Sequence, residues 1–284
     1  RLTTRQLAEG LYLGAHRSHR QGGGVEFGGH RAYVPGDDLR WLDQHALLRH
    51  DRLMIRQFER DSEHALHLVV DDTLSMAFRG DDSPHSKFAF AAALAASLGY
   101  VALRSGDRVA LHWLGGRRAS LQTSGVGSFD RLATALEEVE AAQTLEDAKQ
   151  LEHALLPALK ASQRGGIVVL LSDLIDWDEP WQEPLSWLAG GRRKLVLVRV
   201  SDRTEEDFSL DGAVQLEATE GKHRVLTEPR RVRTAYLESR HAHLESWRRF
   251  LVERGAALLT MVTDEPLTGA TRRVLSAIAG AEAA

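Results

Sequence analysis

Three side chains that carry oxygen follow one apolar run at alternate positions, and their types are those that bind a hard cation. The run Ala65–Val70 is followed by Asp71, Thr73 and Ser75. Where a strand ends the chain turns, so side chains that alternate along it can converge on one point. A carboxylate with two hydroxyls suits Mg²⁺ better than Ca²⁺ or zinc. The spacing therefore predicts a Mg²⁺ site at the end of a strand, with Mn²⁺ or Ca²⁺ as alternative ions.

Two further positions favour this metal site over its structural alternative, in which Asp71 and Thr73 only cap the next helix. Asp173 ends the apolar run Ile167–Leu171, and neighbouring parallel strands end at the same edge of a sheet. Thr144, at the start of the helical stretch before that run, can reach the same edge. The predicted metal ligands are thus Asp71, Thr73, Ser75, Thr144 and Asp173.

The order of apolar and amphipathic stretches predicts the fold that positions these residues. From residue 65 onward, short apolar runs alternate with longer amphipathic ones, as in βαβ units around a mostly parallel sheet. We expect a three-layer, Rossmann-like α/β domain. The expected strands are 65–71, 108–114, 167–171, 194–200 and 257–262, with a short antiparallel edge at 119–122 and a hairpin within 212–226. The expected helices are 86–104, 128–139, 145–162, 179–188, 232–254 and one that starts near Pro266.

Residues 1–62 differ from this main domain, which we place at 63–284. The segment is rich in glycine, histidine and arginine and has only short apolar clusters, so we expect an irregular arm that packs on the main domain. Residues 1–60 contain ten arginines against seven acids, whereas the remainder of the chain is negative. Arg31 and Arg40 either pair with acids of the arm or form a docking face for an acidic partner.

The composition excludes several classes of protein. A formal net charge of −4 and a pI near 6.4 argue against a protein that wraps nucleic acid, which needs a basic surface. The absence of cysteine excludes disulfides and thiolate zinc sites and suits a reducing compartment. No window approaches the roughly 18 to 20 uninterrupted apolar residues of a membrane span, and the start lacks the apolar core of a signal peptide. We expect a cytoplasmic protein with only indirect membrane contact.

Three tryptophans follow the predicted metal edge closely, at positions 177, 181 and 187. Such residues either fill the core or anchor a protein partner beside the metal. Trp177 is therefore a candidate partner-binding residue, together with Arg31 and Arg40.

Enzymatic interpretations fit the sequence less well. An aspartate that accepts a phosphoryl group in the haloacid dehalogenase pattern needs a second aspartate two residues on, where Thr73 stands. The chain contains no phosphate-binding loop with a glycine-lysine-hydroxyl ending, and no pair of histidines on a helix with a glutamate between them. A Mg²⁺-dependent phosphohydrolase using Asp71 and Asp173 is the alternative to a non-enzymatic binding module.

Two motifs make the family resemblance specific. The run Arg31-Ala32-Tyr33-Val34-Pro35-Gly36-Asp37-Asp38 and the turn Asp71-x-Thr73-x-Ser75-Met76 resemble the bacterial family called domain of unknown function 58, and the resemblance covers nearly the whole chain. The five predicted ligands also resemble, in order and approximate spacing, the metal-ion-dependent adhesion site of von Willebrand factor A-type domains. Three positions depart from the pattern: Gln44 replaces the usual tryptophan, Thr73 replaces the commoner serine, and no glycine precedes Thr144.

The resemblance implies both a fold and a function. The fold would be a von Willebrand factor A-like domain, and the protein would be a non-enzymatic partner of a MoxR-type AAA+ ATPase that helps to mature or remodel protein complexes. The hydroxyls of such a site bind the ion directly and the acids often act through water, so a partner's carboxylate can complete the coordination. The sequence indicates neither the client protein nor the oligomeric state.

Overall fold

The computed structural model describes most of the chain from residue 65 onward. It describes residues 65–115, 118–142, 150–160, 162, 166–175, 177–190, 193–210 and 228–280 in full, and the backbone alone at 25–32, 54–60, 148–149, 161, 214–217 and 224–227. The chain divides into two compact units, one formed by residues 17–63 and the other containing residues 64–284.

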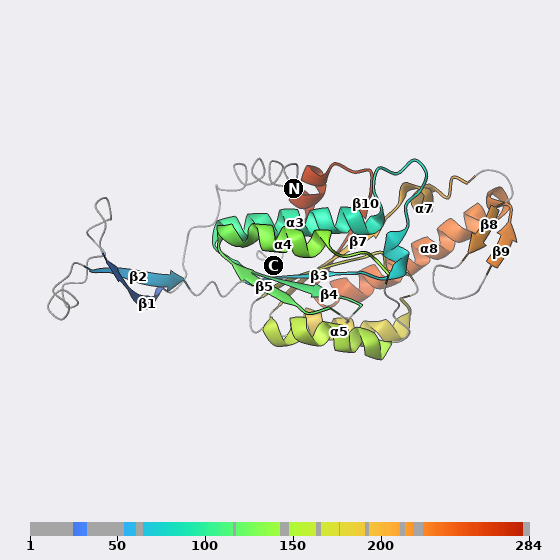
Figure 1. Cartoon of the computed structure of the whole chain (residues 1–284). Coiled ribbons are helices and arrows are strands. Elements are labelled where there is room, and N and C mark those ends of the chain that lie inside the picture. The colour runs from blue at the N-terminus through green and yellow to red at the C-terminus, as the bar shows by residue number, and fades with distance from the viewer. Residues whose placement is uncertain are drawn as a thin grey trace. The chain divides into compact units, whose positions relative to one another are not determined.

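A six-stranded sheet forms the centre of the larger unit (Figure 1). Its strands, in chain order, are β3 (Ala65–Val70), β4 (Arg108–Trp113), β5 (Leu121–Ser124), β6 (Ile167–Ser172), β7 (Lys194–Ser201) and β10 (Ala257–Val262). Their spatial order is β10-β7-β6-β3-β4-β5, and only the β4–β5 pair is antiparallel. The inner strands are apolar on both faces because helices cover both sides of the sheet.

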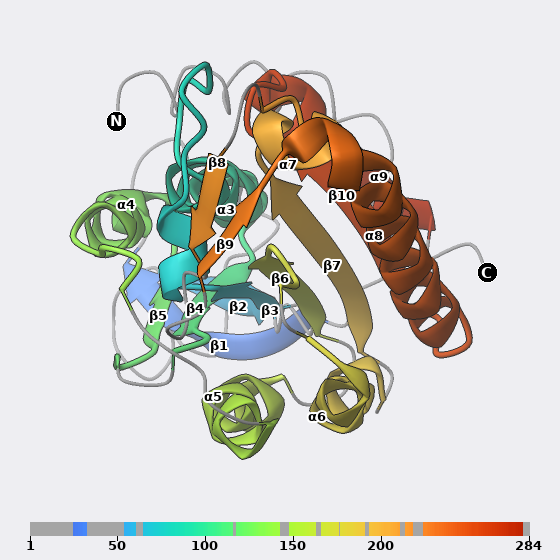
Figure 2. The same ribbon diagram turned by 90° about the vertical axis from the view of Figure 1, so that its right-hand side faces the viewer.

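Helices cover the two faces and bury two separate cores (Figure 2). One face carries α3 (Lys87–Ser105), α4 (Phe129–Glu137) and α9 (Leu267–Gly280); the other carries α5 (Ala148–Ala161), α6 (Gln182–Ala189) and α8 (Pro229–Val252). Shorter elements connect them: η2 (Leu74–Ala77), η3 (Val126–Ser128), η4 (Glu179–Trp181), α7 (Arg203–Asp207) and the antiparallel pair β8 (Val214–Glu217) and β9 (Arg224–Thr227). The result is a three-layer α/β domain.

Helix α3 is the central helix of its layer. The side chain of Ser86 caps its start by accepting a hydrogen bond from the Ala89 amide, and Gly106 ends it with a φ of 90°, a conformation that glycine adopts without strain. By length and composition, with a mean hydropathy of 1.4, α3 could cross a membrane. Most of its residues are instead buried against the sheet, α4 and α9, so its apolar composition is that of a core helix.

The structure confirms the predicted fold class, including the mostly parallel sheet, the antiparallel edge and the hairpin excursion. The edge strand β5 begins at Leu121, two residues later than predicted. Helix α7 was not predicted because its five residues are too few to show an amphipathic period.

The smaller unit contains two strands that the sequence pattern does not predict. The expected irregular arm includes β1 (Val25–Ala32) and β2 (Met54–Arg60), which pair antiparallel. The register shifts between Phe27 and Gly29, so a bulge and two glycines interrupt the alternation by which strands are recognised. That this arm packs on the main domain remains a prediction.

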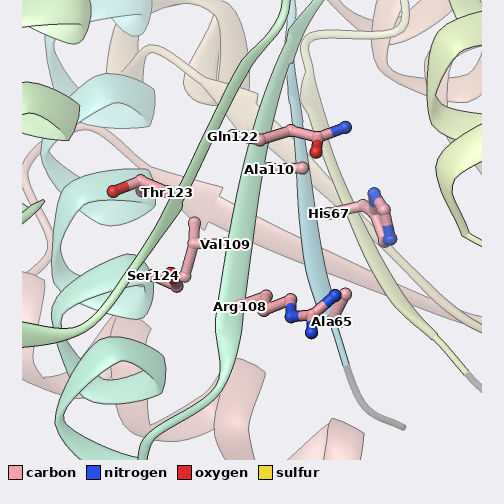
Figure 3. A pocket seen from close by; sticks show the side chains of 8 residues that line it. All are labelled: Ala65, His67, Arg108, Val109, Ala110, Gln122, Thr123 and Ser124. Carbon is pink, nitrogen blue, oxygen red and sulfur yellow. The ribbon is translucent and has the colours of Figure 1, made fainter. Parts of the chain in front are cut away.

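A cavity of about 350 Å³ lies at the amino ends of β3 and β4. Its lining residues are Ala65, His67, Arg108, Val109, Ala110, Gln122, Thr123 and Ser124. In Figure 3 the side chains of His67 and Gln122 extend to one side of the sheet and that of Thr123 to the other.

His67, which lines this cavity, is buried and lies beside a second buried histidine, His112. Nδ1 of His67 lies 3.3 Å from Nε2 of His112, whose Nδ1 lies 2.9 Å from Oγ of Ser120. Burial, together with the charge of Arg193, lowers the pKa of His67 to about 4; burial, together with His67, lowers the pKa of His112 to about 4.

These lowered values predict an acid-sensitive contribution to stability. The unfolded chain binds protons with a histidine pKa near 6.5 and the folded chain only near 4, so the contribution of His112 is complete above pH 6.5 and is lost as the pH falls toward 4. At about 1.4 kcal/mol per pKa unit, it amounts to at most roughly 3 kcal/mol. Urea unfolding between pH 4 and 7 should show a shallower loss of stability in acid for His112→Gln than for the wild type. The exposed His85→Gln variant serves as control, and equal pH slopes in His112→Gln and the wild type would contradict the assignment.

Candidate metal centre

The predicted metal residues lie where the sheet topology reverses. Strands β3 and β6 are parallel neighbours, but the chain proceeds from β3 toward β4 and β5 on one side and from β6 toward β7 and β10 on the other. Side chains at the carboxyl ends of two such strands border an open crevice. The amide of Asp71 donates to the carbonyl of Leu171 over 2.9 Å, which fixes the two strand ends to each other. In Figure 1, η2 is the short cyan coil at the right-hand end of the sheet.

Asp71 and the two hydroxyls converge as the spacing predicts. The Thr73 amide donates to Oδ1 of Asp71 over 2.9 Å, and the hydroxyl oxygens of Thr73 and Ser75 lie 3.1 Å apart. The other carboxylate oxygen of Asp71, Oδ2, accepts a hydrogen bond of 2.5 Å from the hydroxyl of Ser172. Thr73 precedes η2, yet its side chain makes no capping hydrogen bond to that helix. The two hydroxyls therefore lie against each other within this turn, and their role as metal ligands remains a prediction.

Asp173 approaches the same site but is already paired with a buried cation. Its Oδ1 accepts a hydrogen bond from the Ile175 amide over 3.1 Å, and its Oδ2 lies 2.8 Å from Nζ of Lys87. The same ammonium lies 2.6 Å from Oε1 of Glu205. The side chain of Lys87 is 0% exposed. One ammonium thus joins the start of α3, the end of β6 and α7.

The turn that carries Asp173 is strained. Leu174 has a φ of 58°, in the left-handed region, which costs a non-glycine residue about 1 kcal/mol or more. Its side chain is buried in the core on the α5 side, and its amide donates to the Ser172 hydroxyl over 3.1 Å. Burial and this hydrogen bond hold the turn in place, and strain of this kind gathers at functional sites.

The site contains more negative than positive charge. Burial and the charge of Asp173 raise the pKa of Asp71 to about 7, although hydrogen bonds from Ser172 and Thr73 oppose the shift. Burial alone would lower the pKa of Lys87, but the charges of Asp173 and Glu205 raise it above its usual value. When all three are ionised, the carboxylates of Asp71, Asp173 and Glu205 face one ammonium, and the formal charge is then two negative units. The donor oxygens and this charge fit one hard divalent cation.

Asp72 holds two loops beside the site. Its Oδ1 accepts a hydrogen bond from the Gly115 amide over 2.7 Å, and its Oδ2 lies 3.4 Å from Nε of Arg118. Its carbonyl accepts a hydrogen bond from the Ala142 amide over 3.1 Å, in the segment that leads toward Thr144. Burial raises the pKa of Asp72. This residue therefore positions the surroundings of the site from inside the protein.

Asp202 clamps the segment that follows η2. Its Oδ2 accepts a hydrogen bond from the Gly80 amide over 3.0 Å, and its Oδ1 accepts one from the Thr204 amide over 2.8 Å. Asp202 also forms a capping box with Glu205 at the start of α7. A Cβ at position 80 would lie 2.5 Å from Oδ1 of Asp202 and would also overlap the hydroxyl of Thr204. Only glycine permits this close approach.

Of the eight predicted site residues, the structure brings Asp71, Thr73, Ser75 and Asp173 together. Thr144 and Arg40 lie outside the described residues, and Arg31 lies on β1, of which the backbone alone is described. Trp177 is only 3% exposed, stacks on Trp181 with ring centroids 5.5 Å apart, and accepts a hydrogen bond on its carbonyl from Nε1 of Trp247. Its ring lies in the core and offers no surface to a partner here.

Sequence reasoning missed Lys87, Glu205 and Asp72. Lys87 gave one weak signal: it is a cation in the first turn of an otherwise apolar helix, where the helix dipole disfavours positive charge. Among the described residues, no three histidine, aspartate or glutamate side chains form a ready-made metal cluster. The candidate centre therefore depends on hydroxyl ligands, which only their spacing reveals.

Comparisons with known proteins identify relatives of the chain. The family model described as "Protein of unknown function DUF58" matches residues 29–246. Uncharacterized proteins of Mycobacterium tuberculosis, Rv1480, and of Mycobacterium bovis, Mb1516, are each 28% identical over 267 residues, which is 93% of this chain and 82% of theirs.

Solved structures with a related outline include von Willebrand factor A-type proteins. The conserved hypothetical protein BatB from Bacteroides thetaiotaomicron has 10% sequence identity and a TM-score of 0.46, over 78% of this chain and 99% of that one. The VWA domain of SpRpn10 has 7% identity and a TM-score of 0.41, over 74% and 94%. These values say nothing about activity.

The raised pKa of Asp71 predicts that the wild-type carboxylate lowers stability. Asp71 titrates near 7 when folded and near 3.8 when unfolded, so the folded state gains stability as the pH falls through 7 and loses it as the pH rises. In EDTA at pH 8, Asp71→Asn should therefore unfold at a higher temperature than the wild type, by up to about 4 kcal/mol in free energy. The difference should shrink as the pH falls below 7 and vanish only below about pH 3.8, where Asp71 is also protonated in the unfolded chain. The exposed Asp130→Asn variant on α4 is the control; an Asp71→Asn variant less stable than the wild type at pH 8 would overturn this assignment.

Proposed function

The chain belongs to the family described as protein of unknown function DUF58, and on that basis we propose that it is a non-enzymatic protein-interaction module that binds its partner through a divalent cation. The cation would be Mg²⁺, with Mn²⁺ or Ca²⁺ as substitutes, held by Asp71, Thr73, Ser75 and Asp173. The resemblance adds Thr144 to this set.

The charge balance of the buried site carries the proposal. A buried carboxylate without a counter-charge is costly, and it responds by taking up a proton. The pKa of Asp71 rises to about 7 because the side chain is buried and because the charge of Asp173 lies nearby. The Lys87 ammonium is already shared between Asp173 and Glu205. One divalent cation would displace the proton from Asp71 and supply the missing positive charge.

The residues around the proposed ion suit the binding of a protein partner better than catalysis. The hydroxyls of Thr73 and Ser75 can bind an ion as neutral ligands, and a bound Mg²⁺ would supply a coordination position for an acidic side chain of a partner. The ion pair with Lys87 reduces the negative charge that Asp173 would present to the bound ion. Neutral ligands favour recognition of an incoming carboxylate because they leave the ion attractive to it.

The partner in this proposal comes from the family resemblance. We infer a MoxR-type AAA+ ATPase and its client protein, with the present chain as an adaptor in the maturation of protein complexes. Location at the carboxyl edge of a parallel sheet supports a binding role in general, since ligands of open α/β sheets bind there.

The contacts of the described residues do not favour the phosphohydrolase alternative. A phosphoryl-accepting aspartate in the haloacid dehalogenase pattern needs a second aspartate two residues on, and Thr73 occupies that position. Asp173, the second acid in that alternative, is ion-paired with Lys87.

Metal dependence and partner binding can be tested together. Addition of Mg²⁺ should raise the unfolding temperature of the wild-type chain, because an ion that binds only the folded state stabilises it by mass action. The purified chain should capture its cognate MoxR-type ATPase in Mg²⁺ and release it in EDTA. Asp71→Asn should lose both effects while remaining folded.

Asp130→Asn on α4 is the matched control and should behave as the wild type. Capture that is equally strong in EDTA, or a wild type whose unfolding temperature responds to no divalent cation, would refute the proposed function. Release of phosphate from a chromogenic ester in Mg²⁺, dependent on Asp71, would instead support the hydrolase.

A further inference from the structure

Two exposed apolar side chains border the candidate metal centre. Among the described residues, the large hydrophobic side chains that remain exposed are Phe78, Val126, Ile175 and Val252. Phe78 follows Ser75 by three positions and is 39% exposed; Ile175 follows Asp173 by two and is 41% exposed. Isolated exposed hydrophobics are ordinary on a protein surface, but two beside one polar site mark a place for contact.

Both side chains are tied to the same buried ion pair. The ring centroid of Phe78 lies 5.6 Å from Nζ of Lys87, and the Phe78 carbonyl accepts a hydrogen bond from the Lys87 amide over 3.1 Å. The amide of Ile175 donates to Oδ1 of Asp173, the residue that Lys87 pairs with. Phe78 and Ile175 thus belong to one site although they lie in different segments of the chain.

Backbone hydrogen bonds and buried neighbours hold the chain in place at Phe78 and Ile175. The Phe78 amide donates to the Ser75 carbonyl over 3.2 Å, and two residues later Gly80 is clamped against Asp202. Ile175 follows Leu174, whose buried side chain anchors a strained turn. Since a backbone that is already ordered loses little conformational freedom on binding, such positions contribute efficiently to affinity.

We propose that Phe78 and Ile175 form an apolar rim around the metal site, and that the rim selects a partner segment in which an acidic residue is flanked by large apolar residues. The proposal rests on the proposed metal-dependent function and adds its specificity. A cation alone accepts any carboxylate, so discrimination must come from its neighbours. Apolar contacts around a polar centre exclude water and thereby strengthen the central interaction.

The occupant is a protein segment with one carboxylate. The bound ion would offer one open coordination position to an acidic side chain, and the rim offers apolar surface beside it. Apolar residues that flank the acid would bury the exposed parts of Phe78 and Ile175, whereas flanking glycines would leave them in water.

Synthetic peptides can measure this preference on the full chain. The probes are capped Gly-Leu-Asp-Leu-Gly, Gly-Gly-Asp-Gly-Gly and Gly-Leu-Asn-Leu-Gly, titrated in Mg²⁺ and in EDTA and followed by NMR. We expect the leucine-flanked acid to bind at least tenfold more tightly than the glycine-flanked acid, since burial of the exposed parts of the rim side chains is worth about 1 kcal/mol or more each. The asparagine peptide should bind weakly, and EDTA should abolish the binding of both acids.

Variants locate the preference on the rim. Phe78→Ser and Ile175→Ser should each reduce the preference for leucine flanks several-fold and leave the Mg²⁺-induced rise in unfolding temperature unchanged. Val126→Ser is the matched control, since Val126 is 43% exposed and lies in η3; it should retain the wild-type preference. Phe78→Leu keeps an apolar side chain near Lys87 and should keep most of the preference.

The outcomes separate this inference from the function on which it rests. The rim proposal is refuted if both acidic peptides bind with equal affinity in Mg²⁺. It is also refuted if both serine variants keep the preference for leucine flanks. Either result leaves the metal-dependent function standing. A leucine preference that persists in EDTA overturns the metal-dependent function instead. If no acidic peptide binds in Mg²⁺, neither proposal stands.

Discussion

The ion pair between Lys87 and Asp173 is the interaction on which the carboxyl edge of the sheet depends. It is buried, and a buried ammonium is tolerated only where carboxylates surround it. Here it joins the first turn of α3 to the end of β6 and, through Glu205, to α7. Removal of Lys87 would leave the carboxylate of Asp173 without its cation inside the protein. The pair fixes three elements whose residues are far apart in the sequence.

Burial is the largest cause of the raised pKa of Asp71, and Asp173 of this pair adds to it. Asp173 satisfies the ammonium but adds a negative charge next to a second buried carboxylate. Around these two acids, Asp72 and Asp202 hold the neighbouring loops through backbone amides. Four aspartates thus serve two different purposes at one sheet edge. Asp72 and Asp202 maintain the shape of the edge, whereas Asp71 and Asp173 add negative charge to it.

The sequence predicted the elements whose pattern is local. Apolar runs marked the parallel strands, and because parallel neighbours end at one edge of a sheet, Asp173 was expected beside Asp71. Lys87, Glu205 and Asp72 escaped prediction because their partners lie elsewhere in the fold: Lys87 and Glu205 are 118 positions apart. Strands β1 and β2 escaped it because glycines and a bulge interrupt their alternation. Thr144, Arg31 and Arg40 remain predictions, since their side chains lie outside the described residues.

The apolar composition of α3 has a consequence for the chain as it is synthesised. Nineteen residues with a membrane-like hydropathy emerge early, while one of the helices that cover them, α9, begins only at Leu267. Until that helix is made, part of α3 has no cover from its own chain. A truncated protein that ends before α9 would expose this surface, so α9 shields the apolar face of α3 in the folded chain although it supplies none of the candidate ligands.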